Sequence, residues 1–185
     1  MNLSQRIAIA FTLLIAVTAP VSLANEALEA EVKTVYDSKL KELFLYFHQN
    51  PELSTMEHKT SARLADELTA LGYTVHRNVG GTGIVALLEN GDGPLVMFRA
   101  DMDGLPVEEK SGLAYASRAK QIDTNGNEVF VMHACGHDVH ITSLVGTAQL
   151  MAKKRDQWQG TLMLIGQPAE ERVLGAAAMM ADNLW

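Results

Sequence analysis

Apolar positions in the first part of the chain follow two helical patterns. Over residues 26–49 they recur at spacings of three to five, which is typical of one face of an amphipathic helix, and Asn50–Pro51 is expected to end it. Ser54 and Glu57 have the spacing of a capping box, so they predict a second helix that ends at Gly72. The recurring positions of the first helix are Leu28, Val32, Val35, Leu40, Leu43 and Phe47.

Farther along the chain, short apolar runs bounded by turn residues predict strands. These runs are residues 73–76, 84–88, 95–99, 128–132 and 161–165. Asn90–Gly93 is a hairpin-type turn signal between the second and third runs, and the fourth is expected to pair with residues near Tyr115 across the Asn125–Gly126 turn. Helical spacing returns over 138–154 and 174–182, so helices and strands interleave and predict one α/β domain.

Composition agrees with a globular fold and excludes several classes of protein. The 185 residues are 48% apolar and 20% charged, which excludes a disordered or low-complexity chain. Lys and Arg number 15 against 22 Asp and Glu, for a net charge of -7, and no basic cluster stands out, so nucleic acid is not expected as a partner. The single Cys excludes an intramolecular disulfide.

Residues 1–24 have the pattern of a secretory signal peptide. Arg6 precedes the apolar stretch Ile7–Val17, and Ser22–Ala24 places small residues before a cleavage point. A retained N-terminal anchor is the alternative, although the stretch is short for a membrane span of about 20 residues. We therefore expect a secreted or periplasmic protein, with residues 25–185 as the mature part and no stable membrane span after cleavage.

Reactive side chains collect in three loops, each directly after a predicted strand. The loops are residues 99–103 (RADMD), 133–140 (HACGHDVH) and 167–171 (QPAEE). In open α/β sheets, sites form in the crevice beyond the carboxyl ends of the strands. These loops are therefore expected to build one site.

Cys135 and His137 are candidate metal ligands. Gly136 between them allows a tight backbone turn, and a thiolate with an imidazole suits zinc, with manganese also open. The alternative is an inert buried Cys beside a core His. Asp138 and His140 crowd the same loop and would be expensive to bury without a metal or hydrogen bonds, which favours the metal site.

Four acidic residues have two interpretations each, and one further His has one. Glu170 and Glu171 fit a solvated helix start, but beside a metal loop one can bind the ion while the other takes a proton from water. Asp101 and Asp103 fit a turn, and Asp103 is the better candidate to orient a ligating His. His48, near the end of the first helix, is expected to be exposed.

Taken together, four segments resemble the metal-dependent amidohydrolase family of hippurate hydrolase, N-acyl-amino-acid amidohydrolases and plant auxin-conjugate hydrolases, within the wider zinc aminoacylase and carboxypeptidase group. They are residues 47–54 (FHQNPELS), 98–106, 132–140 and 166–171. The combination of HACGHD with QPAEE is specific. The resemblance implies a mixed, mainly parallel sheet flanked by helices, the zinc-exopeptidase-like catalytic domain in incomplete form.

The resemblance also implies roles for individual residues. Cys135, His137 and Glu171 would be metal ligands, Glu170 the general base, and Asp103 a supporting catalytic carboxylate. Two divalent ions, Zn²⁺ or Mn²⁺ with Co²⁺ or Ni²⁺ as options, would activate water to hydrolyse the amide of a small N-acyl amino acid or peptide. The full-length parent would be a candidate homodimer.

Departures from the family pattern bear on substrate preference and on length. Val139 stands where many relatives have a small residue, and residues 172–174 replace a Gly-rich stretch. No His follows Glu171, whereas the family carries two further His ligands and a lid or dimerisation domain downstream. We therefore expect an inactive, aggregation-prone fragment of the hydrolase. A non-catalytic metal-binding remnant is the alternative, and a structural module that has lost its site is disfavoured.

Overall fold

The computed structural model describes residues 26–184. The chain divides into two units, Met1–Ser38 and Lys39–Trp185. In the first, residues 26–35 are helical, and the hydroxyl of Thr34 donates to the carbonyl of Ala30. The predicted signal peptide lies outside the described residues. None of the helices over 26–184 has the length and hydrophobicity needed to cross a membrane.

The predicted helix over residues 26–49 is confirmed, with one irregularity. A π-helical turn, η1 (Tyr36–Leu40), precedes α2 (Lys41–Gln49). It coincides with the five-residue spacing between Val35 and Leu40, because a π turn takes more residues than an α turn. The helix ends as expected at Asn50, whose N–H donates to the carbonyls of the preceding turn.

The second predicted helix, α3 (His58–Ala70), ends at its expected glycine. Gly72 has a φ of +87°, its N–H donates to the carbonyl of Thr69, and the N–H of Tyr73 donates to the carbonyl of Leu68. This pair of bonds is a Schellman motif, which requires a left-handed residue at the Gly72 position. Glycine adopts that conformation without the penalty that a Cβ atom brings.

A four-stranded sheet forms the centre of the second unit, in the order β1-β2-β6-β3. Its strands are β1 (Thr74–Val79), β2 (Gly83–Asn90), β3 (Leu95–Asp101) and β6 (Gly160–Gln167). The expected mixed α/β sheet flanked by helices is confirmed. Its pairings differ from the expected majority of parallel ones: β1 with β2 and β2 with β6 are antiparallel, and β3 with β6 is parallel.

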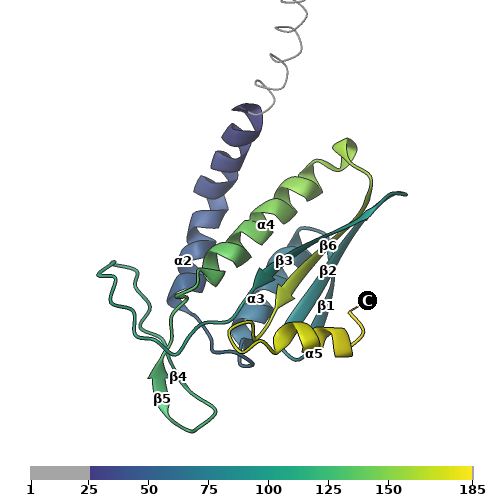
Figure 1. Ribbon diagram of the computed structural model, residues 1–185. Helices are drawn as coiled ribbons and strands as arrows, with labels where there is room; N and C mark the ends of the chain where they lie inside the picture. The colour runs from purple at the N-terminus through teal and green to yellow at the C-terminus, as the bar shows by residue number, and fades with distance from the viewer. Residues whose placement is uncertain (1–25, 185) are drawn as a thin grey trace, which may run out of the picture. The chain divides into compact units, whose positions relative to one another are not determined.

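The hairpin predicted between β2 and β3 is wrong. The turn at Asn90–Gly93 connects the two strands, but β6 lies between them and pairs with both (Figure 1). β6 is almost continuously apolar and at least half-buried along its length, as expected for a strand covered on both faces. Burial of β6 therefore outweighs the local turn signal.

Helices cover both faces of the sheet, and alternate residues of β2 point toward them. Ile84 lies with Leu64 of α3 around Gly166, whereas Val85 packs with Ile165 and with Met179 of α5 (Gly175–Ala181). Helix α4 (His137–Lys153) packs on β3 and β6, beside α3. A short 3₁₀ turn, η2 (Arg155–Gln157), leads from α4 toward β6.

A small separate hairpin is made by β4 (Lys120–Ile122) and β5 (Glu128–Phe130). The strand and the turn before it were predicted, but the expected partner near Tyr115 is wrong. The carboxylate of Asp123 accepts hydrogen bonds from the N–H groups of Asn125 and Asn127, and this turn pairs β5 with the immediately preceding strand.

The topology brings the three chemistry-bearing loops together. Because β3 and β6 are parallel, Asp101 at the end of β3 lies opposite Gln167 at the end of β6. Arg99 links the two ends, since its guanidinium donates to the side chains of both residues. The loop before α4 meets the same edge, where His137 is the first residue of the helix.

Candidate metal centre

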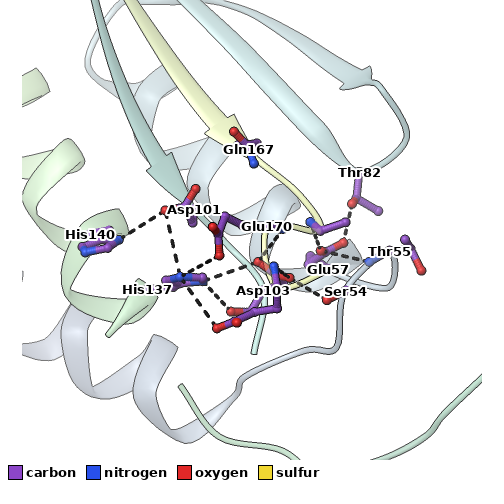
Figure 2. Close-up of polar contacts among 12 residues, drawn as sticks. Ser54, Thr55, Glu57, Thr82, Asp101, Asp103, His137, His140, Gln167 and Glu170 are labelled. Carbon is purple, nitrogen blue, oxygen red and sulfur yellow. Dashed lines mark hydrogen bonds and ion pairs between the residues drawn. The ribbon is translucent and has the colours of Figure 1, made fainter. Parts of the chain in front are cut away.

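Asp103 lies at the middle of the site and is 1% exposed (Figure 2). Its carboxylate accepts hydrogen bonds from the backbone N–H groups of Glu170 and Glu171, both at 3.1 Å, and from the hydroxyl of Ser54 at 2.6 Å. Burial alone would raise its pKa, but the hydrogen bonds from His137, Ser54 and the two N–H groups outweigh burial and lower it. Asp103 thus fastens the QPAEE loop as an ionised acceptor.

The hydrogen bonding of His137 decides which ring nitrogen faces the carboxylates. Nδ1 lies 2.8 Å from the carbonyl oxygen of Asp103, and a carbonyl only accepts, so Nδ1 carries the hydrogen. Nε2 lies 3.8 Å from the carboxylate of Glu170 and 3.9 Å from that of Glu171. Burial would lower the pKa of this imidazole, but the hydrogen bonds to Asp103 raise it overall.

Cys135 lies in the loop before α4, next to Glu171. Its side chain is exposed, and a hydrogen bond to Glu171, followed by burial and nearby carboxylates, raises the pKa of the thiol. Gly136 has a φ of +79°, so the tight turn expected between Cys135 and His137 is present. The thiol therefore adjoins the carboxylate of Glu171, which in turn lies 3.9 Å from Nε2 of His137.

Two overlapping sets of donor atoms in residues 26–184 lie close enough to hold a cation. One comprises His137, Glu170 and Glu171, and the other Asp101, His137 and His140, with the donor atoms of each set within 4.8 Å of one another. Imidazole nitrogen and carboxylate oxygen suit a borderline-soft divalent ion, and Cys135 belongs to neither set. Of the three ligands that the resemblance implies, His137 and Glu171 thus lie together, beside Glu170, and Cys135 lies outside this set.

The two adjacent glutamates differ in their surroundings. The side chain of Glu170 is 41% exposed, whereas that of Glu171 is 15% exposed and adjoins Cys135. Glu171 is the better enclosed ligand, and Glu170 has more room beside it for water or substrate. The solvated-helix alternative does not describe them, because α5 begins only at Gly175.

Asp101 is more than a turn residue. It is 6% exposed, and its carboxylate pairs with Arg99 and lies 3.6 Å from Nδ1 of His140 and 3.9 Å from Nε2 of His137. The sequence left this position undecided because an Asp after a strand has the same local signature in a solvated turn and in a buried cluster.

The predicted exposure of His48 is wrong. Its side chain is 12% exposed, its Nδ1 lies 2.7 Å from the carboxylate of Asp138, and its Nε2 lies 3.3 Å from that of Glu109. Tyr115 meets the ring edge-on at a centroid distance of 5.2 Å. His48 thus ties α2 to the first turn of α4, beside His137, and its position near a helix end gave no sign of this.

The capping box predicted from Ser54 and Glu57 is also wrong. Neither side chain caps α3: Ser54 donates to Asp103, and the carboxylate of Glu57 accepts from the N–H groups of Thr55 and Ala169 and from the hydroxyl of Thr82. Glu52 caps the helix instead, since its carboxylate accepts from both the N–H and the hydroxyl of Thr60.

His133 lies in the same loop as the proposed ligands but differs from them in character. It is 6% exposed, and burial is the main reason that its pKa falls to about 4, so its ring is neutral at physiological pH. Its ring centroid is 6.4 Å from that of His137. His133 therefore lies beside the His137 ring as an uncharged group.

Comparison with known sequences finds one matching family. Residues 97–184 match Peptidase family M20/M25/M40. The chain is 41% identical to the hippurate hydrolase of Campylobacter jejuni over 75% of its own length and 33% of that protein. It is 40% identical to an N-acetyl-L-cysteine deacetylase of Bacillus subtilis over 75% of its length and 31% of that protein. It is 34% identical to an IAA-amino acid hydrolase of Arabidopsis thaliana over 87% of its own length and 36% of that protein.

Solved structures agree with the fold. The YXEP protein of Bacillus subtilis, described as a dinuclear metal binding peptidase of the M20 family, superposes with a TM-score of 0.72 at 32% identity, over 82% of this chain and 40% of that one. An aminobenzoyl-glutamate utilization protein of Klebsiella pneumoniae, at 24% identity and a TM-score of 0.65, shares the fold over 85% of this chain and 43% of that one. The chain spans about a third of the length of the curated relatives it matches.

Proposed function

Since residues 97–184 match Peptidase family M20/M25/M40, we propose that the protein supplies part of the metal-binding side of a hydrolase that cleaves the amide bond of N-acyl amino acids or small peptides. The observation that carries this proposal is the orientation of His137. Its Nδ1 is engaged by the carbonyl of Asp103, so its Nε2 faces the Glu170 and Glu171 carboxylates as a potential ligand.

In this proposal Cys135, His137 and Glu171 hold a divalent cation. Zn²⁺ and Mn²⁺ are the first candidates, with Co²⁺ and Ni²⁺ next, and a second ion would share the centre. When bound, the metal polarises the scissile carbonyl and makes water a stronger acid. Asp103 orients the imidazole of His137 and, through two N–H groups, holds the backbone of both glutamates.

Glu170 has the proton-transfer role. Its side chain is the more exposed of the pair and lies 3.8 Å from Nε2 of His137, so it would lie beside a cation held at that nitrogen without being enclosed by the loop. Its carboxylate would take a proton from the attacking water and deliver it to the leaving amine, which yields a carboxylic acid and a free amino acid.

The substrate class rests on what the named relatives have in common. Hippurate hydrolase, N-acetyl-L-cysteine deacetylase and IAA-amino acid hydrolase are all named for an amide between an acyl group and an amino acid. We extend that chemistry, and not any one acyl group, to this protein.

The test of this function is to purify the natural gene product from its source organism, supply Zn²⁺ or Mn²⁺, and measure hydrolysis of a series of N-acyl amino acids. Glu170→Gln is expected to lower kcat by roughly 10²- to 10⁴-fold, because it removes the proton acceptor. Metal content, measured in the same samples, is expected to stay unchanged. Turnover of Glu170→Gln within a few-fold of wild type would contradict the role of Glu170.

The 185-residue polypeptide by itself is expected to bind metal without turnover. Cys135, His137 and Glu171 are three ligands, and a two-metal centre needs more than three. Metal binding without catalysis is also the alternative function, in which the chain is a remnant of such an enzyme. Turnover by this polypeptide alone would contradict both the expected inactivity and the alternative.

We also propose export from the cytoplasm, to the periplasm in a Gram-negative source. Support comes from the order of features in residues 1–24: a basic residue comes first, an apolar stretch follows, and small residues come last. N-terminal sequencing of secreted material is expected to begin at Asn25, and a first residue of Met1 would contradict cleavage.

A further inference from the structure

Three consecutive backbone N–H groups of the QPAEE loop bind two buried carboxylates. Asp103 accepts from Glu170 and Glu171, while Glu57 accepts from the N–H of Ala169 at 2.8 Å. Glu57 directly precedes α3 and is 112 residues away from Ala169 in the sequence. Figure 2 shows the side chains of Asp103 and Glu57 next to each other beside the loop that carries Glu170.

The Ala169 backbone has an unusual conformation, held on its carbonyl side by the N–H groups of Leu174 and Gly175 and on its N–H side by Glu57. Its φ is +47°, in the left-handed region that a residue with a Cβ atom rarely adopts. Such conformations persist where surrounding contacts over-determine them. Ala169 is also 2% exposed, so without Glu57 its N–H would face no water in compensation.

The Glu57 side chain does not cap α3, the helix that begins directly after it. It is completely buried, and its carboxylate accepts from the hydroxyl of Thr82 at 2.5 Å and from the N–H of Thr55 at 3.0 Å. The start of α3 is capped by Glu52 through Thr60. Removing the Glu57 carboxylate therefore leaves the helix cap in place.

We propose that Glu57 is a positioning residue for the Glu170–Glu171 pair: it holds Ala169 in the left-handed conformation that directs both glutamate side chains toward His137. The consequence for metal binding rests on the function proposed above, in which Glu171 is a ligand. The consequence for the backbone of residues 169–171 does not depend on that function.

Three variants of the 185-residue chain test this inference. Glu57→Met removes both acceptor oxygens at similar volume. Glu57→Gln keeps one carbonyl acceptor for Ala169, and Thr82→Val removes another partner of Glu57 while leaving the bond to Ala169. Hydrogen exchange at the amides of residues 169–171 and affinity for Co²⁺ alone are measured for each, beside the melting temperature.

Glu57→Met is expected to speed exchange at Ala169 by tenfold or more and to weaken Co²⁺ binding by about 10- to 100-fold, the range for groups that support a ligand. Glu57→Gln is expected to keep the exchange rate at Ala169 and the Co²⁺ affinity within about threefold of wild type. Thr82→Val is expected to lower the melting temperature while the exchange rate and the Co²⁺ affinity stay within the same range. A merely structural role would lower the melting temperature of Glu57→Met and Thr82→Val alike, with Co²⁺ affinity unchanged.

Unchanged exchange at residues 169–171 in a folded Glu57→Met would overturn the inference. Should that variant not fold, Glu57→Asp, which withdraws the carboxylate by one methylene and keeps its charge, takes its place with the same expectations. If the wild-type chain does not bind Co²⁺, the proposed metal function fails, and the exchange data alone still decide the role of Glu57.

Discussion

Asp103 and Glu57 are buried carboxylates that accept hydrogen bonds from backbone N–H groups of the QPAEE loop, Asp103 from two and Glu57 from one. The hydrogen bonds that Asp103 accepts outweigh burial and lower its pKa, so it binds the loop as a charged acceptor, and charged hydrogen bonds are about twice as strong as neutral ones. Burial raises the pKa of Glu57. The Glu170–Glu171 pair is thus held through its backbone, and its position does not depend on contacts of the two side chains.

Cys135 is the proposed ligand that is simplest to test alone. Cys135→Ser is expected to reduce affinity for Zn²⁺ strongly, because a hydroxyl is a far weaker ligand than a thiolate. Since Cys135 is exposed, the free energy of unfolding of the metal-free chain should change by no more than about 0.5 kcal/mol. Metal titration and urea denaturation measure the two effects, and unchanged Zn²⁺ affinity would exclude Cys135 as a ligand.

At the scale of elements, His48 joins α2 to α4 through Asp138 and reaches Glu109 in the intervening loop. His48→Leu leaves two buried carboxylates each short of a partner, so it is expected to cost about 2–4 kcal/mol of unfolding free energy. His58→Leu, an exposed His at the start of α3, is the matched control and should cost far less. Equal losses in urea denaturation would contradict a bridging role for His48.

Tyr73 connects the end of α3 to α4, since its buried hydroxyl donates to the carbonyl of Ala148 at 3.1 Å. Burial raises its pKa to about 12, above the ordinary value of 10.0. An acid with a raised pKa in the folded state contributes stability that is full below pH 10 and is lost as the pH rises toward 12.

Tyr73→Phe is therefore expected to cost about 1 kcal/mol at pH 7, through loss of one hydrogen bond, and to flatten the fall in stability between pH 10 and 12. Urea denaturation across that pH range measures both effects. A fall as steep as that of wild type would mean that other groups cause the alkaline loss.

At the scale of the whole folded unit, β3 is an edge of the four-stranded sheet and carries exposed apolar side chains. Leu95, Val96, Met97 and Phe98 are each 45–58% exposed. An edge strand with unpaired backbone groups and apolar side chains favours pairing with another chain. The 185-residue polypeptide is therefore expected to self-associate through β3.

Val96→Lys is expected to reduce this association, because a charge on an edge strand opposes intermolecular pairing. Val173→Lys adds the same charge at a position that is 89% exposed and outside the sheet, and it serves as the control. Light scattering against concentration compares them. Equal reduction by both variants would mean that net charge, and not the β3 edge, controls association.

The sequence by itself determined the elements and the chemistry-bearing loops. Apolar periodicity and glycines such as Gly72 act over a few residues, so helices and strands could be predicted close to their observed bounds. The residue types in HACGHD and QPAEE likewise carry their chemistry locally, which is why Cys135, His137 and the two glutamates could be singled out.

Only the tertiary structure decided how those parts meet. The bonds of Ser54, Glu57 and His48 to their partners span 49, 112 and 90 residues, and nothing in the local sequence distinguishes such a bond from a helix cap or an exposed side chain. The central place of β6 was decided in the same way, because burial of an apolar strand on both faces is a property of the assembled sheet and not of the turn that precedes β3.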